Sequence, residues 1–220
     1  MDPGLYEAVA SGDEATIFEN FSRDTVLSIE TREKNSVLHV AVVRKQLGMV
    51  NKILLLQSDH QCRPLLHLAS RLGCQEIVAV ILNRHRKNIE TTTYYEDDVL
   101  TRFWKQLVDR ERSSSSPKEI TSMANLEMDT ALHVAVKSGC LSVAELLIHE
   151  DAKLTLLTNG AGESPLFLAV ERKCFDIARC LVDSDKKNSL AGRDGMNALH
   201  VAVVYSQQGW FYTQGTSFLN

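Results

Sequence analysis

Apolar residues recur along the chain in a short box, in which a leucine is followed three residues later by an alanine and then by a further residue that is usually apolar. The copies begin at Leu5, Leu38, Leu66, Leu132, Leu166 and Leu199. Successive copies are separated by 33, 28, 66, 34 and 33 residues, so three intervals equal one period and a fourth equals two. The second to fifth boxes are each followed by another apolar stripe with spacings of three and four residues, which places the stripe on one helical face. Each period is therefore predicted to be two short helices and a turn.

Neither helix of such a pair can bury its apolar face alone, so neighbouring pairs must stack and share a core. The pattern predicts an all-α solenoid of helix-turn-helix units. The second stripes are Val50, Ile53 and Leu54, then Ile77, Val78, Ile81 and Leu82, then Val143, Leu146 and Leu147, and then Ile177, Leu181 and Val182. The box alanines are expected at close contacts between helices, where a larger side chain would overpack the stack; they are Ala8, Ala41, Ala69, Ala135, Ala169 and Ala202.

The fourth box carries a known signature. It reads Thr130-Ala131-Leu132-His133-Val134-Ala135, is followed by Gly139, and resembles the Thr-Pro-Leu-His-x-Ala signature of ankyrin repeats. The fifth box, Ser164-Pro165-Leu166-Phe167-Leu168-Ala169, is similar, with phenylalanine replacing histidine. The resemblance covers residues 1–85 and 121–205 and implies a fold that works by binding other proteins.

A narrower resemblance is to plant ankyrin proteins of the accelerated-cell-death type. It rests on the opening Met1-Asp2-Pro3 with Leu5-Tyr6-Glu7-Ala8, on the enlarged third repeat, and on Gly162-Glu163-Ser164-Pro165-Leu166. Those proteins are associated with defence and cell-death signalling, and they carry a C-terminal membrane domain with a Pro-Gly-Gly motif that this sequence does not have. The resemblance implies a role in plant signalling, in defence or stress.

The period divides the chain into four parts. We expect repeats 1–3 in residues 1–85, an insertion with an amphipathic helix and a serine-rich loop in residues 86–125, repeats 4–6 in residues 126–205 with the last incomplete, and an irregular tail in residues 206–220. In the insertion, Phe103 and Trp104 lie on an apolar helical face that either packs on the solenoid or anchors a partner.

The sixth repeat lacks a second apolar stripe. One hypothesis is that the chain is a truncated product, a splice variant or the result of a mispredicted gene end. The other is that Trp210, Phe211 and Tyr212 fold back as a cap, because a repeat array needs a covered end. In the first case the protein would be a soluble competitor of a longer, membrane-anchored relative.

Composition narrows the function classes. A formal net charge of −4 gives no basic footprint for nucleic acid. No apolar run approaches the ~18 residues of a membrane span, and the odd number of cysteines, 5, favours a reducing compartment. We therefore expect a cytoplasmic location for the chain as written, or the cytosolic face of a membrane if a longer isoform carries the membrane domain. Nucleophile, phosphate-loop and metalloprotease motifs do not occur, so the sequence predicts neither an enzyme nor a cofactor.

Several repeated polar residues have structural interpretations. His39, His67, His133 and His200 lie one per repeat, which suits hydrogen-bonding struts at the helix starts better than ligands of one metal ion. Cys74, Cys140 and Cys174 share one repeat position and are expected to be small buried thiols. Asn159-Gly160-Ala161-Gly162 falls where a turn is due and is interpreted as turn chemistry.

Candidate partner-binding residues fall into two groups. The variable positions at the end of each first helix are expected on the concave side; among them are Arg44, Arg71, Lys137, Glu171, Arg172 and Tyr205. The turn tips lie three and four residues before each signature; among them are Arg32, Glu33, His60, Gln61, Glu127, Arg193 and Asp194. Because the first group is mostly basic, the predicted partner is a protein with an acidic peptide segment, although a solvated helical face explains the same pattern.

Overall fold

The computed structural model describes residues 3–28, 30, 36–56, 62–85, 120–184 and 188–207. It divides into an N-terminal unit, residues 1–120, and a C-terminal unit, residues 121–220. Of the predicted parts, residues 86–119 of the insertion and 208–220 of the tail lie outside the described residues. Each unit is described by itself.

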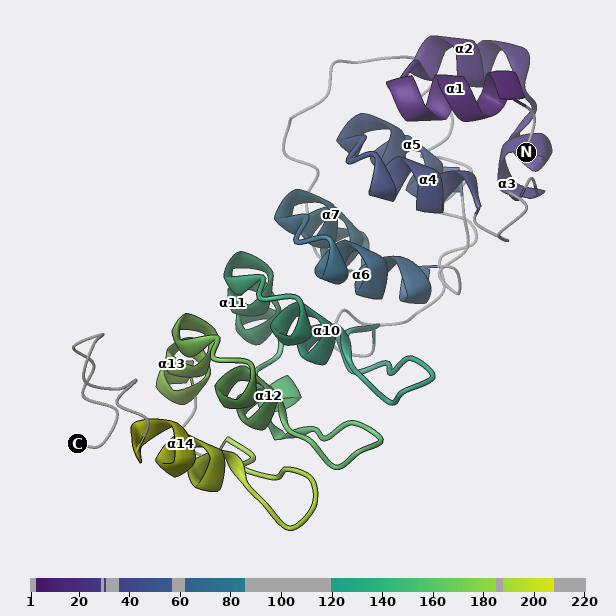
Figure 1. Cartoon of the computed structure of the whole chain (residues 1–220). Coiled ribbons are helices and arrows are strands. Elements are labelled where there is room, and N and C mark those ends of the chain that lie inside the picture. Colours follow the sequence, from purple (N-terminus) through teal and green to yellow (C-terminus); the bar gives the residue numbers. More distant parts are fainter. Residues whose placement is uncertain are drawn as a thin grey trace. The chain divides into compact units, whose positions relative to one another are not determined.

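The N-terminal unit consists of helix pairs stacked side by side (Figure 1). Its helices are α1 (Pro3–Ser11), α2 (Glu14–Asn20), α3 (Arg23–Ser28), α4 (Val37–Val43), α5 (Leu47–Leu56), α6 (Cys62–Arg71) and α7 (Gln75–His85). The first helices of successive repeats, α1, α4 and α6, contact one another, and α5 contacts α7. These contacts confirm the predicted stacking between periods. The contacts of α1 with α2, of α4 with α5 and of α6 with α7 confirm the pairing within a period.

The C-terminal unit repeats the same arrangement. Its elements are α10 (Ala131–Lys137), α11 (Leu141–Glu150), the 3-10 helix η2 (Ala152–Leu156), α12 (Pro165–Glu171), α13 (Phe175–Ser184) and α14 (Ala198–Gln207). Here α10, α12 and α14 stack in order, and α11 packs on α13. We call α10, α12, α14 and their equivalents the inner helices, and the second helix of each pair the outer helix.

The signature residues explain where the inner helices begin. Ser36, Ser164 and Asn197 each stand directly before an inner helix, and their side-chain oxygens accept a hydrogen bond from the backbone N–H three residues later. An N-cap of this kind satisfies a donor that the helix leaves unpaired. Pro165 occupies the first helical position, where its missing N–H costs nothing.

The inner helices end in a common motif. In the first five boxes the residue five after the alanine donates its N–H to the alanine carbonyl, at 2.8 Å for Cys174 and 3.0 Å for Cys140. The residue directly before the donor has a left-handed backbone, as at Gly139 with φ 71° and Lys173 with φ 61°. This is the Schellman arrangement, and it turns the chain towards the outer helix. The last inner helix differs, because Ser206 replaces the left-handed residue and α14 continues to Gln207, two residues into the segment predicted to be irregular.

Most of the predicted core is buried. Every stripe residue of the second and third repeats is buried, as are the box alanines except Ala202, which is half-buried. The prediction was wrong for Val182, which is exposed, because Ala178 on the preceding turn of α13 takes the inward position. Of the three equivalent cysteines only Cys74 is buried, whereas Cys140 and Cys174 are half-buried.

Successive repeats are joined by hairpin turns. Isolated antiparallel bridges pair Glu30 with Ser36, Ala124 with Thr130, and Ala191 with Asn197. The turn of the fourth repeat therefore begins at Ala124, two residues before the expected boundary, because the residue paired with Thr130 belongs to the hairpin. Among the described residues, no helix combines the length and the apolar character that crossing a membrane requires.

Candidate protein-binding surface

Two asparagines hold the hairpins of the fourth and fifth repeats in shape. The side-chain oxygen of Asn125 accepts hydrogen bonds from the N–H groups of Glu127 and Asp129, both at 2.9 Å. Asn159 repeats the pattern in the next hairpin, with Ala161 and Glu163 as donors at 3.0 Å. An asparagine that bonds its own turn in this way replaces backbone pairing. The interpretation of residues 159–162 as turn chemistry is confirmed.

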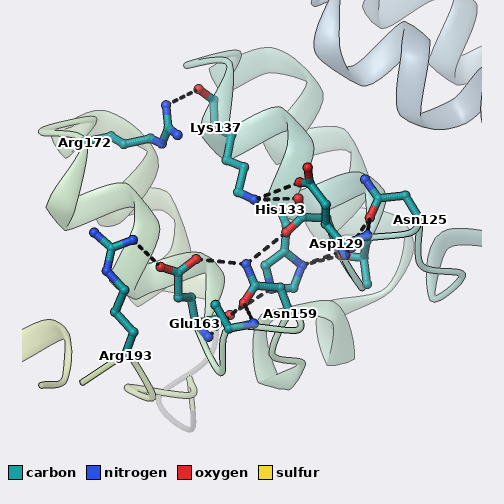
Figure 2. A network of polar contacts seen from close by, with 11 residues as sticks. Asn125, Asp129, His133, Lys137, Asn159, Glu163, Arg172 and Arg193 are labelled. Atoms are coloured by element: carbon teal, nitrogen blue, oxygen red, sulfur yellow. Dashed lines mark hydrogen bonds and ion pairs between the residues drawn. The ribbon is translucent and has the colours of Figure 1, made fainter. Parts of the chain in front are cut away.

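A buried polar network joins these two hairpins (Figure 2). The amide nitrogen of Asn159 donates to Asp129 at 3.0 Å and to Glu163 at 2.9 Å. Both carboxylates are buried, and each has a cation: Lys137 lies 2.5 Å from Asp129, and Arg193 lies 3.0 Å from Glu163. Burial alone would raise the pKa of Asp129, but the hydrogen bonds from Lys137 and Asn159 outweigh it and hold that pKa below its usual value.

His133 links the same hairpins from the inner helix. Its Nδ1 accepts from the N–H of Thr130 at 3.2 Å, so Nε2 carries the proton and donates to the carbonyl of Glu163, also at 3.2 Å. The ring is buried, and desolvation lowers its pKa, opposed by the nearby charge of Asp129. The interpretation as a strut is confirmed for this histidine.

Other histidines of the signature bond locally. Nδ1 of His39 lies 2.7 Å from the hydroxyl of Ser36, and Nδ1 of His200 accepts from the N–H of Asn197 at 3.1 Å. Each ring is therefore engaged at the start of its own helix. Within the described part of the chain, no group of three or more His, Cys, Asp or Glu side chains converges as metal ligands would.

Three candidates at the ends of inner helices reach back to the preceding repeat. A guanidinium nitrogen of Arg44 donates to the hydroxyl of Tyr6 at 3.2 Å, and one of Arg172 donates to the carbonyl of Lys137 at 3.0 Å. The hydroxyl of Tyr205 donates to the carbonyl of Glu171 at 3.0 Å. Neither acceptor of the two arginines carries a charge, so both guanidinium groups are positioned without being neutralised.

The predicted basic stripe is interrupted in the C-terminal unit. Lys137 is half-buried and paired with Asp129, and its Nζ also lies 3.6 Å from a carboxylate oxygen of Glu127. Glu171 is paired with Arg193. Sequence spacing places Lys137 and Glu171 at the same position of their helices, but it does not predict their partners. The partner of Lys137 lies in the hairpin of its own repeat, and the partner of Glu171 lies in the hairpin of the next repeat. Arg71, at the end of α6, is exposed.

The hairpin of the fourth repeat presents two apolar side chains. Leu126 is fully exposed and Met128 is 58% exposed, on either side of the exposed Glu127. Met128 has φ 59°, whereas Gly162 and Gly195 occupy the equivalent positions in the next two hairpins. Met128 was not among the predicted residues, although a methionine where other repeats have glycine was visible in the sequence.

The remaining candidates divide in two. Arg193 and Asp194 are exposed in the hairpin of the sixth repeat, as predicted for a turn tip. The others lie outside the described residues; they are Arg32, Glu33, His60, Gln61, Phe103 and Trp104.

Comparison with known proteins agrees with this architecture. The family model of ankyrin repeats, with three copies, matches residues 132–210. A solved structure of the ankyrin repeat domain of Bcl-3, described as a unique member of the IkappaB protein family, is similar at a TM-score of 0.64 and 20% identity, over 96% of this chain and 84% of that one. No curated protein matches the sequence. The fold is thus the all-α ankyrin-repeat solenoid, and residues 132–210 are the part of the chain that matches the ankyrin-repeat family model.

Proposed function

We propose that the chain is a non-enzymatic module that binds another protein through its hairpin tips and the ends of its inner helices. The observation that carries the proposal is the hairpin of residues 124–130, which is fixed from within and apolar at its tip. Asn125 fixes the turn, and the N–H of Gly160 donates to the carbonyl of Glu127 at 3.0 Å, which ties the tip to the next hairpin. A rigid, exposed tip loses little conformational freedom when it binds.

The backbone of Met128 adds to this argument. A left-handed conformation is unfavourable by roughly 1–2 kcal/mol for a residue with a Cβ atom, and glycine would avoid that cost, as it does at Gly162 and Gly195. Strained residues of this kind concentrate at functional sites. The strain has a use if the side chain of Met128 contacts a partner together with Leu126.

The structure revises the proposal of an acidic peptide partner. Lys137 is neutralised by Asp129, so the cations that remain for such a partner are Arg44 and Arg71 in the N-terminal unit and Arg172 in the C-terminal unit. Hydrogen bonds to uncharged acceptors position two of these three side chains. We infer that an acidic segment would bind within one unit, at Arg172 in the C-terminal unit or at Arg44 and Arg71 in the N-terminal unit, and not along the whole predicted stripe.

Narrower hypotheses rest on the sequence resemblance alone. The motifs shared with plant ankyrin proteins of the accelerated-cell-death type support a cytoplasmic signalling role in defence or stress. An alternative is that the chain is a soluble competitor for the partners of a longer, membrane-anchored relative. The intact mass of the endogenous protein, together with the end of its transcript, separates these two roles.

Affinity purification followed by quantitative mass spectrometry tests the binding role. The variants are Leu126→Ser and Arg172→Glu, and the control is Arg179→Glu, an exposed arginine of the outer helix α13. We expect a specific set of proteins with the wild type and the control, and a several-fold loss of the same set with one or both surface variants. An identical set from all four proteins would refute the proposed surface.

The acidic-partner hypothesis has its own test. Fluorescence anisotropy measures the binding of a labelled oligo-glutamate peptide to the same proteins at low and moderate salt. Exposed ion pairs contribute about 0.2–1 kcal/mol, so we expect Arg172→Glu to weaken binding by about 1.4- to fivefold. Equal weakening by Arg179→Glu would show that only net charge matters, and the peptide hypothesis would fail while the binding role stood.

A further inference from the structure

The three hairpins of the C-terminal unit project side by side from the starts of its inner helices (Figure 1). The hydrogen bond from Gly160 to Glu127 joins the first hairpin to the second, and the N–H of Ser164 donates to the carbonyl of Ala191 at 2.9 Å, which joins the second to the third. Packed helices lie about 8–10 Å apart, so the three tips extend over about 16–20 Å, a length that about six residues of extended chain span. We call these tips the tip row; they are residues 126–128, 160–162 and 193–195.

The middle tip of the row offers backbone acceptors, whereas its backbone donors are already used. It reads Gly160-Ala161-Gly162, so its largest side chain is a methyl group. The N–H of Gly160 donates to Glu127, and the next two N–H groups donate to the side chain and the carbonyl of Asn159. The carbonyls of Gly160 and Ala161 accept no hydrogen bond from any described residue, and both residues are exposed. A partner that lies across this tip must therefore supply the donors.

The tips on either side of the middle one carry negative charge. Glu127 and Asp194 are exposed at equivalent positions of the first and third tips. Both cations of the hairpins are engaged with other carboxylates, Lys137 with Asp129 and Arg193 with Glu163 and Glu171. Five carboxylates against two cations leave a net charge of −3; the carboxylates are Glu127, Asp129, Glu163, Glu171 and Asp194, and the cations are Lys137 and Arg193.

We propose that the tip row binds an extended partner segment that carries both basic and apolar side chains. Lysine or arginine side chains of the partner face Glu127 and Asp194 and donate to the carbonyls of the middle tip, and its apolar side chains pack on Leu126 and Met128. Complementary charge of this kind steers association and fixes the register of the segment. Because the row is part of the proposed binding surface, the inference rests on that binding role and adds the chemistry of the partner.

The opposite end of the inner helices has the opposite charge. Arg172 stands directly after α12, about 10 Å along the helix axis from the middle hairpin. An acidic segment at Arg172 and a basic segment at the tip row would therefore occupy different parts of the same unit. The two proposals make opposite predictions about which peptides respond to charge changes in the tips.

Fluorescence anisotropy with the full chain tests the proposal. The probes are labelled peptides of about eight residues, enough to cover the row: one contains lysine and leucine, and the other has glutamate in place of lysine. The tip variant combines Glu127→Gln with Asp194→Asn, and asparagine readily adopts the left-handed backbone that Asp194 has, with φ 56°. The control combines Glu145→Gln with Asp183→Asn, which makes the same change in net charge on exposed residues of the outer helices α11 and α13.

We expect the wild type to bind the lysine–leucine peptide more tightly than the glutamate–leucine peptide. Each exposed ion pair changes a dissociation constant by about 1.4- to fivefold, so the tip variant should weaken the lysine–leucine peptide by about 2- to 25-fold. The control should leave this affinity unchanged at physiological salt, where charges more than about 8 Å away are screened. Leu126→Ser should weaken the same peptide as well, because it removes an apolar contact.

Three outcomes overturn the proposal. Equal weakening by the tip variant and the control would show that only net charge matters. Tighter binding of the glutamate–leucine peptide would reverse the sign assigned to the row, and a wild type that binds neither peptide would refute the basic segment. Affinity purification with the tip variant separates this inference from the binding role: proteins that are lost with Leu126→Ser but retained with the tip variant would refute the basic segment and leave the binding role intact.

Discussion

The replacement Asn159→Asp exchanges the NH2 group of a buried side-chain amide for an oxygen and leaves the other oxygen in place. The side-chain oxygen of Asn159 accepts two backbone hydrogen bonds within its own turn, and an aspartate oxygen can keep both. The amide nitrogen, in contrast, donates to the buried carboxylates of Asp129 and Glu163, and an aspartate has no donor for them at neutral pH. The substitution therefore leaves the turn intact and removes the bridge between two hairpins.

The expected cost follows from the two lost bonds. Hydrogen bonds to charged groups contribute about 1.5–3 kcal/mol each, so losing both should lower the stability of the C-terminal unit by about 3–6 kcal/mol. Repulsion between the new carboxylate and its two neighbours adds to this loss. Because small domains are stable by only about 5–15 kcal/mol in total, the variant should open the repeats of residues 131–171 at moderate temperature.

Hydrogen exchange at the backbone amides of residues 131–171 measures the loss locally, and urea denaturation followed by circular dichroism measures it globally. Asn125→Asp is the matched control, because Asn125 makes the same two turn bonds in the preceding hairpin and its amide nitrogen is not the bridge to Glu163. The control should change stability by less than about 1 kcal/mol. If Asn159→Asp were as mild as Asn125→Asp, the network would contribute little and this account of the stacking would be wrong.

Three further predictions concern other features of the described residues. Gly192→Ala should destabilise by about 1–3 kcal/mol through overpacking, because an added Cβ would overlap the buried ring of Phe167, and a thermal melt of the pure variant checks this. Lys45→Gly should raise the urea midpoint, because it relieves a φ of 57° and the gain outweighs the added entropy of glycine; an unchanged or lower midpoint contradicts it. Folding keeps His133 neutral with a lowered pKa, so the unfolded chain binds more protons, and stability should fall as pH drops below about 6.5. His133→Gln should flatten that dependence in urea titrations at several pH values, and an equally steep profile would assign the effect to other groups.

The repeat period predicted the helices because each one buries residues that the periodicity itself marks. Leu38, Leu66 and Leu132 recur at the start of inner helices and are all fully buried. A stacked array makes nearly identical demands at each repeat, so a pattern that recurs in phase carries most of the information about the fold. The exception is Val182, where the register of one outer helix turned the predicted residue outwards.

The partners of the polar residues were not predictable in the same way. Lys137 was placed correctly at the end of its helix, but its ammonium group forms an ion pair with Asp129, eight residues earlier in the hairpin. Glu171 forms an ion pair with Arg193, which lies in the hairpin of the next repeat. Helical periodicity describes one element at a time, whereas these pairs depend on how a turn folds over the end of a neighbouring helix. The candidate surface was therefore located by sequence, while the charges it presents required the structure.

Phe167 shows how a departure from the signature is accommodated. In the fourth repeat His133 reaches the next hairpin by a hydrogen bond to the carbonyl of Glu163. A phenylalanine at this position offers no donor and needs more room, and the ring of Phe167 is fully buried against Gly192. Gly192 stands where the two preceding hairpins have Asn125 and Asn159. The loss of the asparagine therefore makes space for the ring, and an apolar contact replaces a polar one between the fifth and sixth repeats.

The exchange has a consequence for the sixth hairpin and for binding. Without an asparagine to bond its turn, this hairpin is joined to the fifth repeat in three ways. Gly192 contacts Phe167, and the N–H of Ser164 donates to the carbonyl of Ala191 at 2.9 Å. Arg193 adds two ion pairs, with Glu163 and Glu171. Arg193 is itself half exposed, and ion pairs open to solvent are weakened by salt. The tip of residues 124–130 is held by two hydrogen bonds to Asn125 and by the buried bond from Asn159 to Asp129. It should therefore keep its shape at salt concentrations that weaken the ion pairs of Arg193 beside the tip carrying Asp194. A partner that uses both tips would lose affinity with salt through the second tip, even where its own contacts are apolar.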